Sequence, residues 1–238
     1  MQLLDFSLDL PSQNLALDEA ILDDAEENGG APTLRFWESP AYFVALGYTN
    51  RAATETNQEE CCARNIPILR RATGGGTVLQ GPGCLNYALV DSIETGQSLN
   101  VSATNEAVMS RVRDALNPLL GGDVDICGAT DGTWRGRKFS GNAQKRRAHF
   151  FLFHGTVLFD FDLDLVGQVL RSPSKEPAYR ANRSHIDFIT NVPLQREQIK
   201  TALAEVFGAT QSASVVPLDR MNRLIETRYA RDEWNLRF

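Results

Sequence analysis

The segment RAHFFLFHGTVLFDF, residues 147–161, constrains the fold more than any other part of the chain. It is almost continuously apolar, whereas a strand with one face in water alternates apolar and polar side chains. A segment of this kind is typical of a central strand that is buried on both faces. We therefore expect a sheet with covering layers, and this segment near its middle.

The remaining periodicity divides the chain into strands and helices. Further strands are expected at 33–37, 42–48, 66–70, 84–92, 123–128, 132–136 and 137–144, and helices at 12–28, 56–65, 102–120, 162–170, 194–208 and 217–234. Ser102 or Thr104 is a candidate cap for the third helix, and Gly208 ends the fifth. The strands and helices do not alternate as in a doubly wound sheet. This pattern predicts an α+β fold with a mixed, largely antiparallel β-sheet flanked by α-helices, in one domain of residues 1–238.

Charge and cysteine content narrow the possible partners. The formal net charge is −6, which argues against a nucleic-acid-binding protein. The first residues carry no basic region before an apolar run, and no apolar stretch is long enough for a membrane span, so a cytoplasmic protein without a membrane partner is expected. The four cysteines (Cys61, Cys62, Cys84 and Cys127) lack the spacing of a metal site and are expected to be reduced.

Three consecutive glycines follow two arginines in RRATGGGTV, residues 70–78. The pattern matches neither the phosphate loop of nucleotide hydrolases nor the glycine turn of dinucleotide-binding domains. Backbone N–H groups of Gly74, Gly75 and Gly76 can approach a ligand closely and form an anion-binding concavity, while Arg70 and Arg71 supply positive charge. The alternative is a flexible glycine hairpin with two arginines on the surface.

A second group of cations lies at Arg135, Arg137, Lys138 and residues 145–147. Lys138 is placed on a strand in GRKFSGNAQ, where the small residues Ser140, Gly141 and Ala143 leave room for a ligand beside its ammonium group. Such a lysine stabilises negative charge on a carbonyl or phosphoryl oxygen. The alternative is a solvated hairpin lysine, with neighbouring arginines that are solvated or dock an acidic partner.

Five segments in order give the chain a resemblance to a known family. They are NLALDEAIL, LRFWESPAYFVALGYTN, IPILRRATGGGTV, GRKFSGNAQ and FHGTVLFDFDLDLV. Together they resemble the catalytic domain of lipoate-protein ligase A, within the group that also contains biotin protein ligases and octanoyltransferases. The resemblance implies the fold of that catalytic domain.

The resemblance also implies an activity. A ligase of this family activates lipoate with ATP and Mg²⁺ to lipoyl-AMP and transfers the acyl group to a lysine of a lipoyl domain. The expected acceptors are the lipoyl domain of a 2-oxoacid dehydrogenase E2 and the glycine cleavage H protein.

The resemblance assigns roles to particular residues. Lys138 is the expected catalytic residue, which contacts the carbonyl and phosphate of the mixed anhydride. Asp131 is a candidate Mg²⁺ contact and Cys127 an alternative nucleophile. The residues expected to bind the substrate or adenylate are Arg71, Gly74, Gly75, Gly76, Thr77, Val78, Asn86, Ser140, Gly141, Ala143 and His154. For His154, a satisfied core histidine is the alternative, and His149 and His185 are taken as structural.

Two departures from the family pattern leave other functions open. The first is that Gln80 and Gly81 stand where the family usually has His-Asp. The second is that the chain ends about where the catalytic domain of the family ends. No C-terminal accessory domain is therefore expected, and a separate accessory polypeptide is a possible partner. One alternative is an octanoyl- or lipoyltransferase that works without ATP and carries the acyl group on Cys127, or less plausibly on Cys84. Another is a non-catalytic protein that binds lipoate or its adenylate.

Overall fold

The computed structural model describes residues 1–93, 100–173, 175–213 and 215–238. Its central strand is β11 (Phe150–Leu158), antiparallel both to β10 (Asn142–Arg146) and to β6 (Cys84–Ser92). Phe151 and Phe153 are buried on one face of β11 and Leu152 on the other, so the expectation of a strand buried on both faces is confirmed. The strand is shorter than the apolar segment because Arg147 turns back to bond Phe150, and residues 159 and 160 bond Gly83.

The main sheet has six strands in the order β10-β11-β6-β2-β1-β12. Strand β2 (Thr33–Trp37) is antiparallel to β6, while β1 (Gln2–Asp5) is parallel to both β2 and the short strand β12 (Gln211–Ser212). The sheet is therefore mixed and largely antiparallel, as the sequence predicts.

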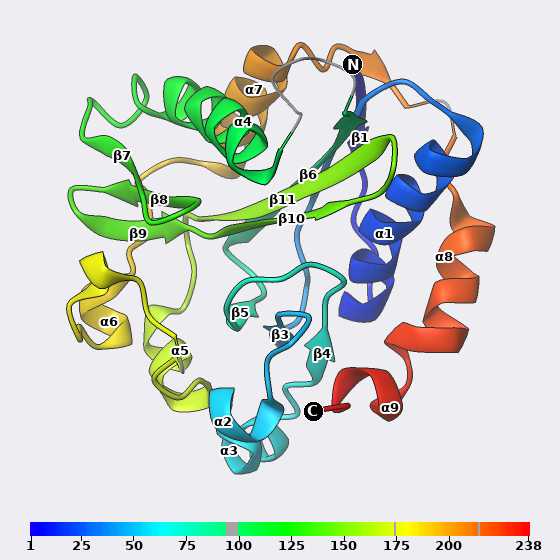
Figure 1. Cartoon of the computed structure of the whole chain (residues 1–238). Coiled ribbons are helices and arrows are strands. Elements are labelled where there is room, and N and C mark those ends of the chain that lie inside the picture. The colour runs from blue at the N-terminus through cyan, green and yellow to red at the C-terminus, as the bar shows by residue number, and fades with distance from the viewer. Residues whose placement is uncertain (94–99, 174, 214) are drawn as a thin grey trace.

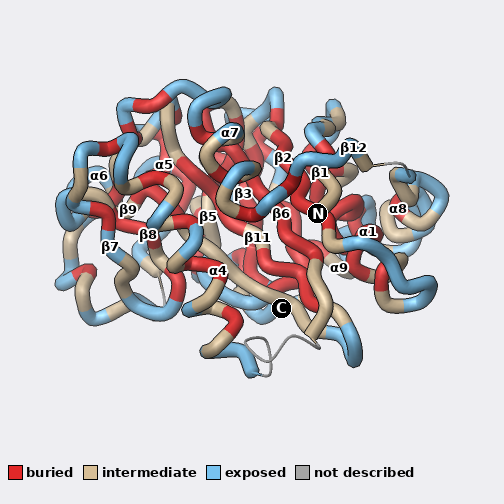
Figure 2. The backbone as a smooth tube through the Cα atoms, turned by 90° about the horizontal axis from the view of Figure 1, so that it is seen from above, coloured by how far each residue is buried: buried red, intermediate tan, exposed pale blue. Residues whose placement is uncertain are grey.

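Helices cover both faces of this sheet (Figure 1). On one face, α4 (Val101–Leu116) and α7 (Arg196–Phe207) pack on Leu85, Tyr87 and Phe153, and on the other α1 (Pro11–Asn28) and α8 (Leu218–Leu224) pack around Ala88 and Leu152. Figure 2 shows the buried residues concentrated along the strands between these layers. Helix α4 is capped by Asn100, whose side chain accepts from Ala103 N at 2.9 Å, and not by Ser102 or Thr104.

Two three-stranded sheets stand beside the main one. In the first, β3 (Phe43–Leu46) lies between β4 (Ile68–Arg70), to which it is parallel, and β5 (Val78–Gln80), to which it is antiparallel. The glycine-rich residues between β4 and β5 thus cross over the end of β3, which excludes the hairpin alternative. The second sheet holds β7 (Val124–Cys127), β8 (Asp131–Trp134) and β9 (Arg137–Ser140).

Two predicted elements are divided in the structure. The expected strand 137–144 changes sheet at Gly141, so that β9 and β10 belong to different sheets. The expected helix 217–234 becomes α8, a π-helical turn η2 (Ile225–Tyr229) and α9 (Asp232–Asn235). The remaining short helices are α2 (Ala52–Glu55), α3 (Gln58–Ala63), α5 (Leu163–Val169), η1 (Ala178–Arg180) and α6 (His185–Phe188). None of the helices in the described ranges has the length and hydrophobicity needed to cross a bilayer.

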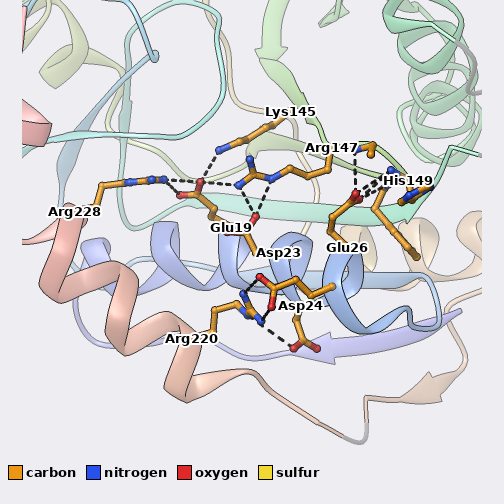
Figure 3. A network of polar contacts seen from close by, with 12 residues as sticks. Glu19, Asp23, Asp24, Glu26, Lys145, Arg147, His149, Arg220 and Arg228 are labelled. Atoms are coloured by element: carbon orange, nitrogen blue, oxygen red, sulfur yellow. Dashed lines mark hydrogen bonds and ion pairs between the residues drawn. The ribbon is translucent and has the colours of Figure 1, made fainter.

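Part of the basic cluster proves to be internal to the molecule. Lys145 and Arg228 both bond the carboxylate of Glu19, a residue of α1 that is completely buried, and Tyr229 donates to it at 2.7 Å (Figure 3). Arg147 pairs with Asp23 of the same helix. These cations therefore fix β10 and the C-terminal segment to α1, and are less available for a docking partner than the sequence suggests.

The Glu19 network predicts an acid-sensitive contribution to stability. Burial alone would raise the pKa of Glu19, but the charge and hydrogen bond of Lys145, with Tyr229 and Arg228, outweigh it and lower the pKa below the ordinary 4.5. The stabilisation is therefore complete above pH 4.5 and is lost as the pH falls through the lowered value.

We expect Glu19→Gln to reduce the free energy of unfolding by about 3 kcal/mol near neutral pH, because it leaves two cations without their buried partner. Urea unfolding at neutral and acid pH measures this loss, with Glu27→Gln, which removes the exposed partner of Arg220, as the control. The difference between Glu19→Gln and the unchanged protein should shrink in acid. An equal difference at both pH values would contradict this reading.

Candidate functional site

A cavity with two adjoining lobes lies where the main sheet meets the two small sheets. The polar lobe, of about 290 Å³, is bordered by α1, the glycine-rich crossing, β6, the turn between β7 and β8, and β11. The apolar lobe, of about 100 Å³, is bordered by Leu79, Phe139, Phe161 and Ile189 among others. Lys138 and Thr77 line both lobes. A ligand that extends through both would pass the Lys138 ammonium group.

Most of the residues proposed from the sequence meet at this cavity. The polar lobe is lined by Arg71, Gly75, Gly76, Thr77, Val78, Asn86, Asp131, Lys138, Gly141, Ala143 and His154, and the apolar lobe by Ser140. Gly74 and Cys127 border neither lobe.

Lys138 is held by a chain of polar contacts. Its ammonium nitrogen lies 2.7 Å from Asp131 Oδ1, and the hydroxyl of Tyr179 donates to Asp131 Oδ2 at 2.6 Å. Burial and the charge of Asp131 raise the pKa of Tyr179, so that its hydroxyl remains a donor. A β-carbon at position 141 would lie 3.1 Å from Lys138 Cε, and glycine there leaves the lysine its space. The ammonium group is thereby oriented while its side chain keeps 23% of its surface exposed.

The contacts of Asp131 with Lys138 and Tyr179 bear on its expected role as an Mg²⁺ ligand. Each carboxylate oxygen of Asp131 already has one partner, Lys138 or Tyr179, and keeps a further lone pair. Within the described ranges, no group of three or more His, Cys, Asp or Glu residues is placed to hold a metal ion. The residues present do not form a protein-built Mg²⁺ site, and the role of Asp131 seen here is to orient Lys138.

Residues 71–77, the glycine segment, wrap around the side chain of Arg71. The buried Arg71 guanidinium donates to Gly74 O at 2.7 Å and to Gly76 O at 2.9 Å. Gly75 has φ +89°, and a β-carbon there would lie 2.8 Å from Arg71 Nη2. Burial lowers the pKa of Arg71 to about 10, so the group stays charged at neutral pH. The Nε and Nη2 groups of Arg71 hold the segment's own carbonyls, while the residue also borders the polar lobe, so its contact with a ligand stays a prediction from the sequence.

This clamp engages carbonyls of the glycine segment and leaves the N–H groups of its three glycines free. In the described part of the chain, the N–H groups of Gly74, Gly75 and Gly76 have no acceptor. Gly75 and Gly76 border the polar lobe. They are therefore available as donors to an anionic or carbonyl oxygen of a ligand.

Arg70 serves the structure and not the ligand. It is completely buried, and its guanidinium donates to the carbonyls of Gly47, Tyr48 and Asn50 on one side and of Trp234 and Asn235 on the other. It fixes the C-terminal segment to the loop after β3. The sequence-based role for Arg70 as a cation of the anion site is wrong.

The cysteines differ sharply in environment. Cys127 is partly buried, pairs across the β7–β8 hairpin with Asp131, and has its sulfur 3.5 Å from Thr133 Oγ1. The next residue, Gly128, borders the polar lobe. Cys84 is completely buried, and burial raises the pKa of its thiol, which makes it a poor nucleophile. Of these two thiols, Cys127 is the one beside the Lys138–Asp131 pair.

Several residues of the cavity escaped the sequence analysis. Asp18 and Trp37 border the polar lobe, and Arg180 and Phe188 border both lobes. One signal was present in α1, where Asp18 falls on the same helical face as Leu15 and Leu22. An acidic residue on an apolar face points to a buried partner, which here is Arg35, at 2.6 Å.

The chain matches the family described as "Lipoyl protein ligase A/B catalytic domain" over residues 10–208. That match covers most of its length, and the protein belongs to this family. It is an enzyme of lipoylation, a lipoate-protein ligase or a related acyltransferase.

Curated relatives fall in both activity classes. The octanoyltransferase LipM of Brevibacillus brevis is 29% identical, with 95% of each chain covered, and that of Carboxydothermus hydrogenoformans is also 29% identical with 95% coverage of each. Lipoate–protein ligase 1 of Staphylococcus aureus is 27% identical, with 94% of this chain and 70% of that protein covered.

Solved structures share the fold. A lipoate-protein ligase A bound with ATP superposes with a TM-score of 0.85 at 24% identity and covers 99% of this chain and 98% of that one. A bipartite lipoate protein ligase from Thermoplasma acidophilum, studied with its E2 lipoyl domain, has a TM-score of 0.84 at 24% identity, with 99% and 95% covered. These likenesses confirm the predicted fold class.

Proposed function

We propose that this protein is an octanoyl- or lipoyltransferase that moves a medium-chain acyl group from a thioester donor to a lysine amine of a lipoyl domain, with Cys127 as the carrier. The observation that carries the proposal is the position of Cys127. Its partner across the hairpin is Asp131, whose carboxylate holds the Lys138 ammonium 2.7 Å away. The octanoyltransferases among the curated relatives support the same activity.

The proposed reaction has two transfers. Cys127 gives up its thiol proton and its thiolate attacks the donor's carbonyl. The bond from that carbonyl to the donor's sulfur breaks, a new thioester forms on Cys127, and the departing sulfur takes up the proton that Cys127 gave. The acceptor lysine, as a free amine, then attacks this thioester, an amide forms and the Cys127 thiol is released. In both steps negative charge develops on the acyl oxygen, where the Lys138 ammonium and the free N–H groups of Gly75 and Gly76 are available to stabilise it.

The ATP-dependent ligase is the second candidate. It is supported by the curated ligase relative and by the cations Arg180 and Lys175, which border the polar lobe and would face the phosphate of an acyl-adenylate. In this alternative, ATP supplies the activated acyl group and the reaction needs no cysteine. Mg²⁺ would be held by the nucleotide's phosphates, since the residues that the structure describes include no carboxylate cluster for it.

The choice of donor tests the proposal. We expect the purified protein to octanoylate a lipoyl domain from an octanoyl-acyl carrier protein thioester without ATP, as measured by mass spectrometry of the acceptor. Octanoate or lipoate with Mg-ATP should give little product and little AMP. The opposite result, in which ATP is required and the thioester is inert, would establish the ligase. Binding without product from either donor, with an accessory polypeptide added, would favour a non-catalytic carrier.

The acceptor and the location of the protein belong to the same proposal. The solved bipartite ligase was studied with its E2 lipoyl domain, which supports a lipoyl domain of an E2 component as the acceptor here. The glycine cleavage H protein and a cytoplasmic site of action remain predictions from the sequence.

A further inference from the structure

Three residues from distant segments form a series of polar contacts beside the glycine segment, in which Thr73 and Asp18 are buried and the side chain of His154 is 14% exposed at the polar lobe. Thr73 Oγ1 lies 2.7 Å from His154 Nε2, and His154 Nδ1 lies 3.5 Å from Asp18 Oδ2. Thr73 belongs to the glycine segment, His154 to β11 and Asp18 to α1. Thr73 is 1% exposed and Asp18 is 2% exposed, so water competes little for these contacts.

We infer that His154, oriented by Asp18, is a positioning residue that holds the glycine segment against the cavity through Thr73. None of the three residues Thr73, His154 and Asp18 takes part directly in the proposed reaction. The inference rests on the proposed function only for its kinetic assay, because its other two measurements concern binding and protonation.

The donors and acceptors in the Thr73–His154–Asp18 contacts can be assigned. The Asp18 carboxylate only accepts hydrogen bonds, so a bare Nδ1 lone pair facing it would be repelled and the proton belongs on Nδ1. Asp18 is itself fixed by Arg35 Nη1 at 2.6 Å and lies 3.3 Å from Trp37 Nε1. In the tautomer that carries its only proton on Nδ1, His154 presents Nε2 as an acceptor, and the Thr73 hydroxyl donates to it.

The glycine segment needs such an anchor. Three glycines in a row lose much conformational freedom when they are ordered, and glycine has no side chain that could pack against the rest of the protein. The described hydrogen bonds that hold the segment include the Arg71 clamp, the bond from Arg71 N to Leu46 O at 3.0 Å, the bond from Tyr48 N to Thr73 O at 2.8 Å, and the bond to His154. The clamp acts from within the segment and the two backbone bonds tie it to β3 and the loop after it, whereas His154 ties it to the main sheet. Loss of the His154 bond therefore loosens the segment relative to the main sheet, which forms the opposite wall of the cavity.

Thr73→Val is the direct test, because it replaces the hydroxyl by a methyl group of similar size. We expect it to weaken octanoate binding, measured by calorimetry, and to raise KM for the acyl donor, each by about 5- to 50-fold, since a buried nitrogen loses its donor. Thr73→Ser keeps the hydroxyl and should stay within about 3-fold of the unchanged protein. Thr56→Val is the matched control: Thr56 is also completely buried, its hydroxyl bonds the Ala52 carbonyl at 2.7 Å, and it borders neither lobe itself.

Coupling and protonation separate positioning from a general loss of structure. Thr73→Val combined with His154→Gln should be no worse than His154→Gln alone, because both break the same link. In the unchanged protein, nitrogen NMR of the imidazole rings should show His154, identified by its absence in His154→Gln, with its proton on Nδ1.

Either of two results would overturn the inference. One is a Thr73→Val protein that binds octanoate as the unchanged protein does, or that changes no more than Thr56→Val. The other is a His154 ring that carries its only proton on Nε2, which would leave Nδ1 with nothing to donate to Asp18 and would contradict the orientation by Asp18 even where a variant fails to fold. If the unchanged protein transfers no acyl group from either donor, the proposed function fails, while the binding and NMR results still stand for or against the role of His154.

Discussion

Lys138→Ala is expected to lower kcat/KM for acyl transfer by at least about 100-fold. It removes a cation that borders both lobes and that Asp131 orients toward the acyl oxygen. Arg180 also borders both lobes, but its Nε group contacts Arg183 O and Glu176 and not Asp131. The loss should appear with either donor, since both reactions develop charge on the same acyl oxygen.

The fold should survive this substitution. Lys138 is partly exposed, and Asp131 keeps the bond from Tyr179. Thermal unfolding of Lys138→Ala should therefore stay close to that of the unchanged protein. Lys200→Ala is the matched control, because that lysine pairs with Asp5 and Glu197 outside the cavity. Comparable activity in Lys138→Ala and Lys200→Ala would remove Lys138 from the mechanism.

Cys127→Ala is expected to reduce thioester-dependent transfer by at least about a thousand-fold, since alanine offers no nucleophile to accept the acyl group. The substitution removes one sulfur from a partly buried position, and its effect on folding should be small. Steady-state transfer from octanoyl-acyl carrier protein to a lipoyl domain measures the loss.

Cys62→Ala is the control for Cys127→Ala. Cys62 is exposed on α3 and away from the cavity, so its removal should leave transfer unchanged. Retention of thioester transfer in Cys127→Ala would require another nucleophile. Full retention of an ATP-dependent activity in the same variant would support the ligase instead.

Features of this molecule that depend on local patterns were predictable from the sequence. The apolar run 147–161 places β11 at the centre of the sheet, and the small residues after Lys138 mark the space that the structure shows around its ammonium group. Both conclusions need only the properties of neighbouring residues. Gly208, which has φ +66°, likewise ends α7 as a local signal predicts.

Features that depend on contacts between distant segments were not predictable in this way. Arg70 is adjacent to the glycine segment in sequence, yet its guanidinium is occupied by carbonyls of residues 234 and 235, which only the folded chain brings near. Glu19 looks like a solvent-facing acid of an amphipathic helix, but its partners Lys145 and Arg228 lie on other elements. Asp18 lies on the apolar face of the same helix, which signals a buried partner but does not say that the partner is Arg35. The buried ion pairs of Asp18 and Glu19 cannot be assigned without knowing which cations the fold brings to α1.

The most direct test of the account is to trap the acyl group on the enzyme. The protein is mixed with octanoyl-acyl carrier protein in the absence of ATP and of any acceptor, and the intact mass and the peptides are measured by mass spectrometry. We expect one octanoyl group per chain, on the peptide that contains Cys127, and its disappearance when a lipoyl domain is added. An unmodified protein that nevertheless forms octanoyl- or lipoyl-AMP from Mg-ATP would contradict the account.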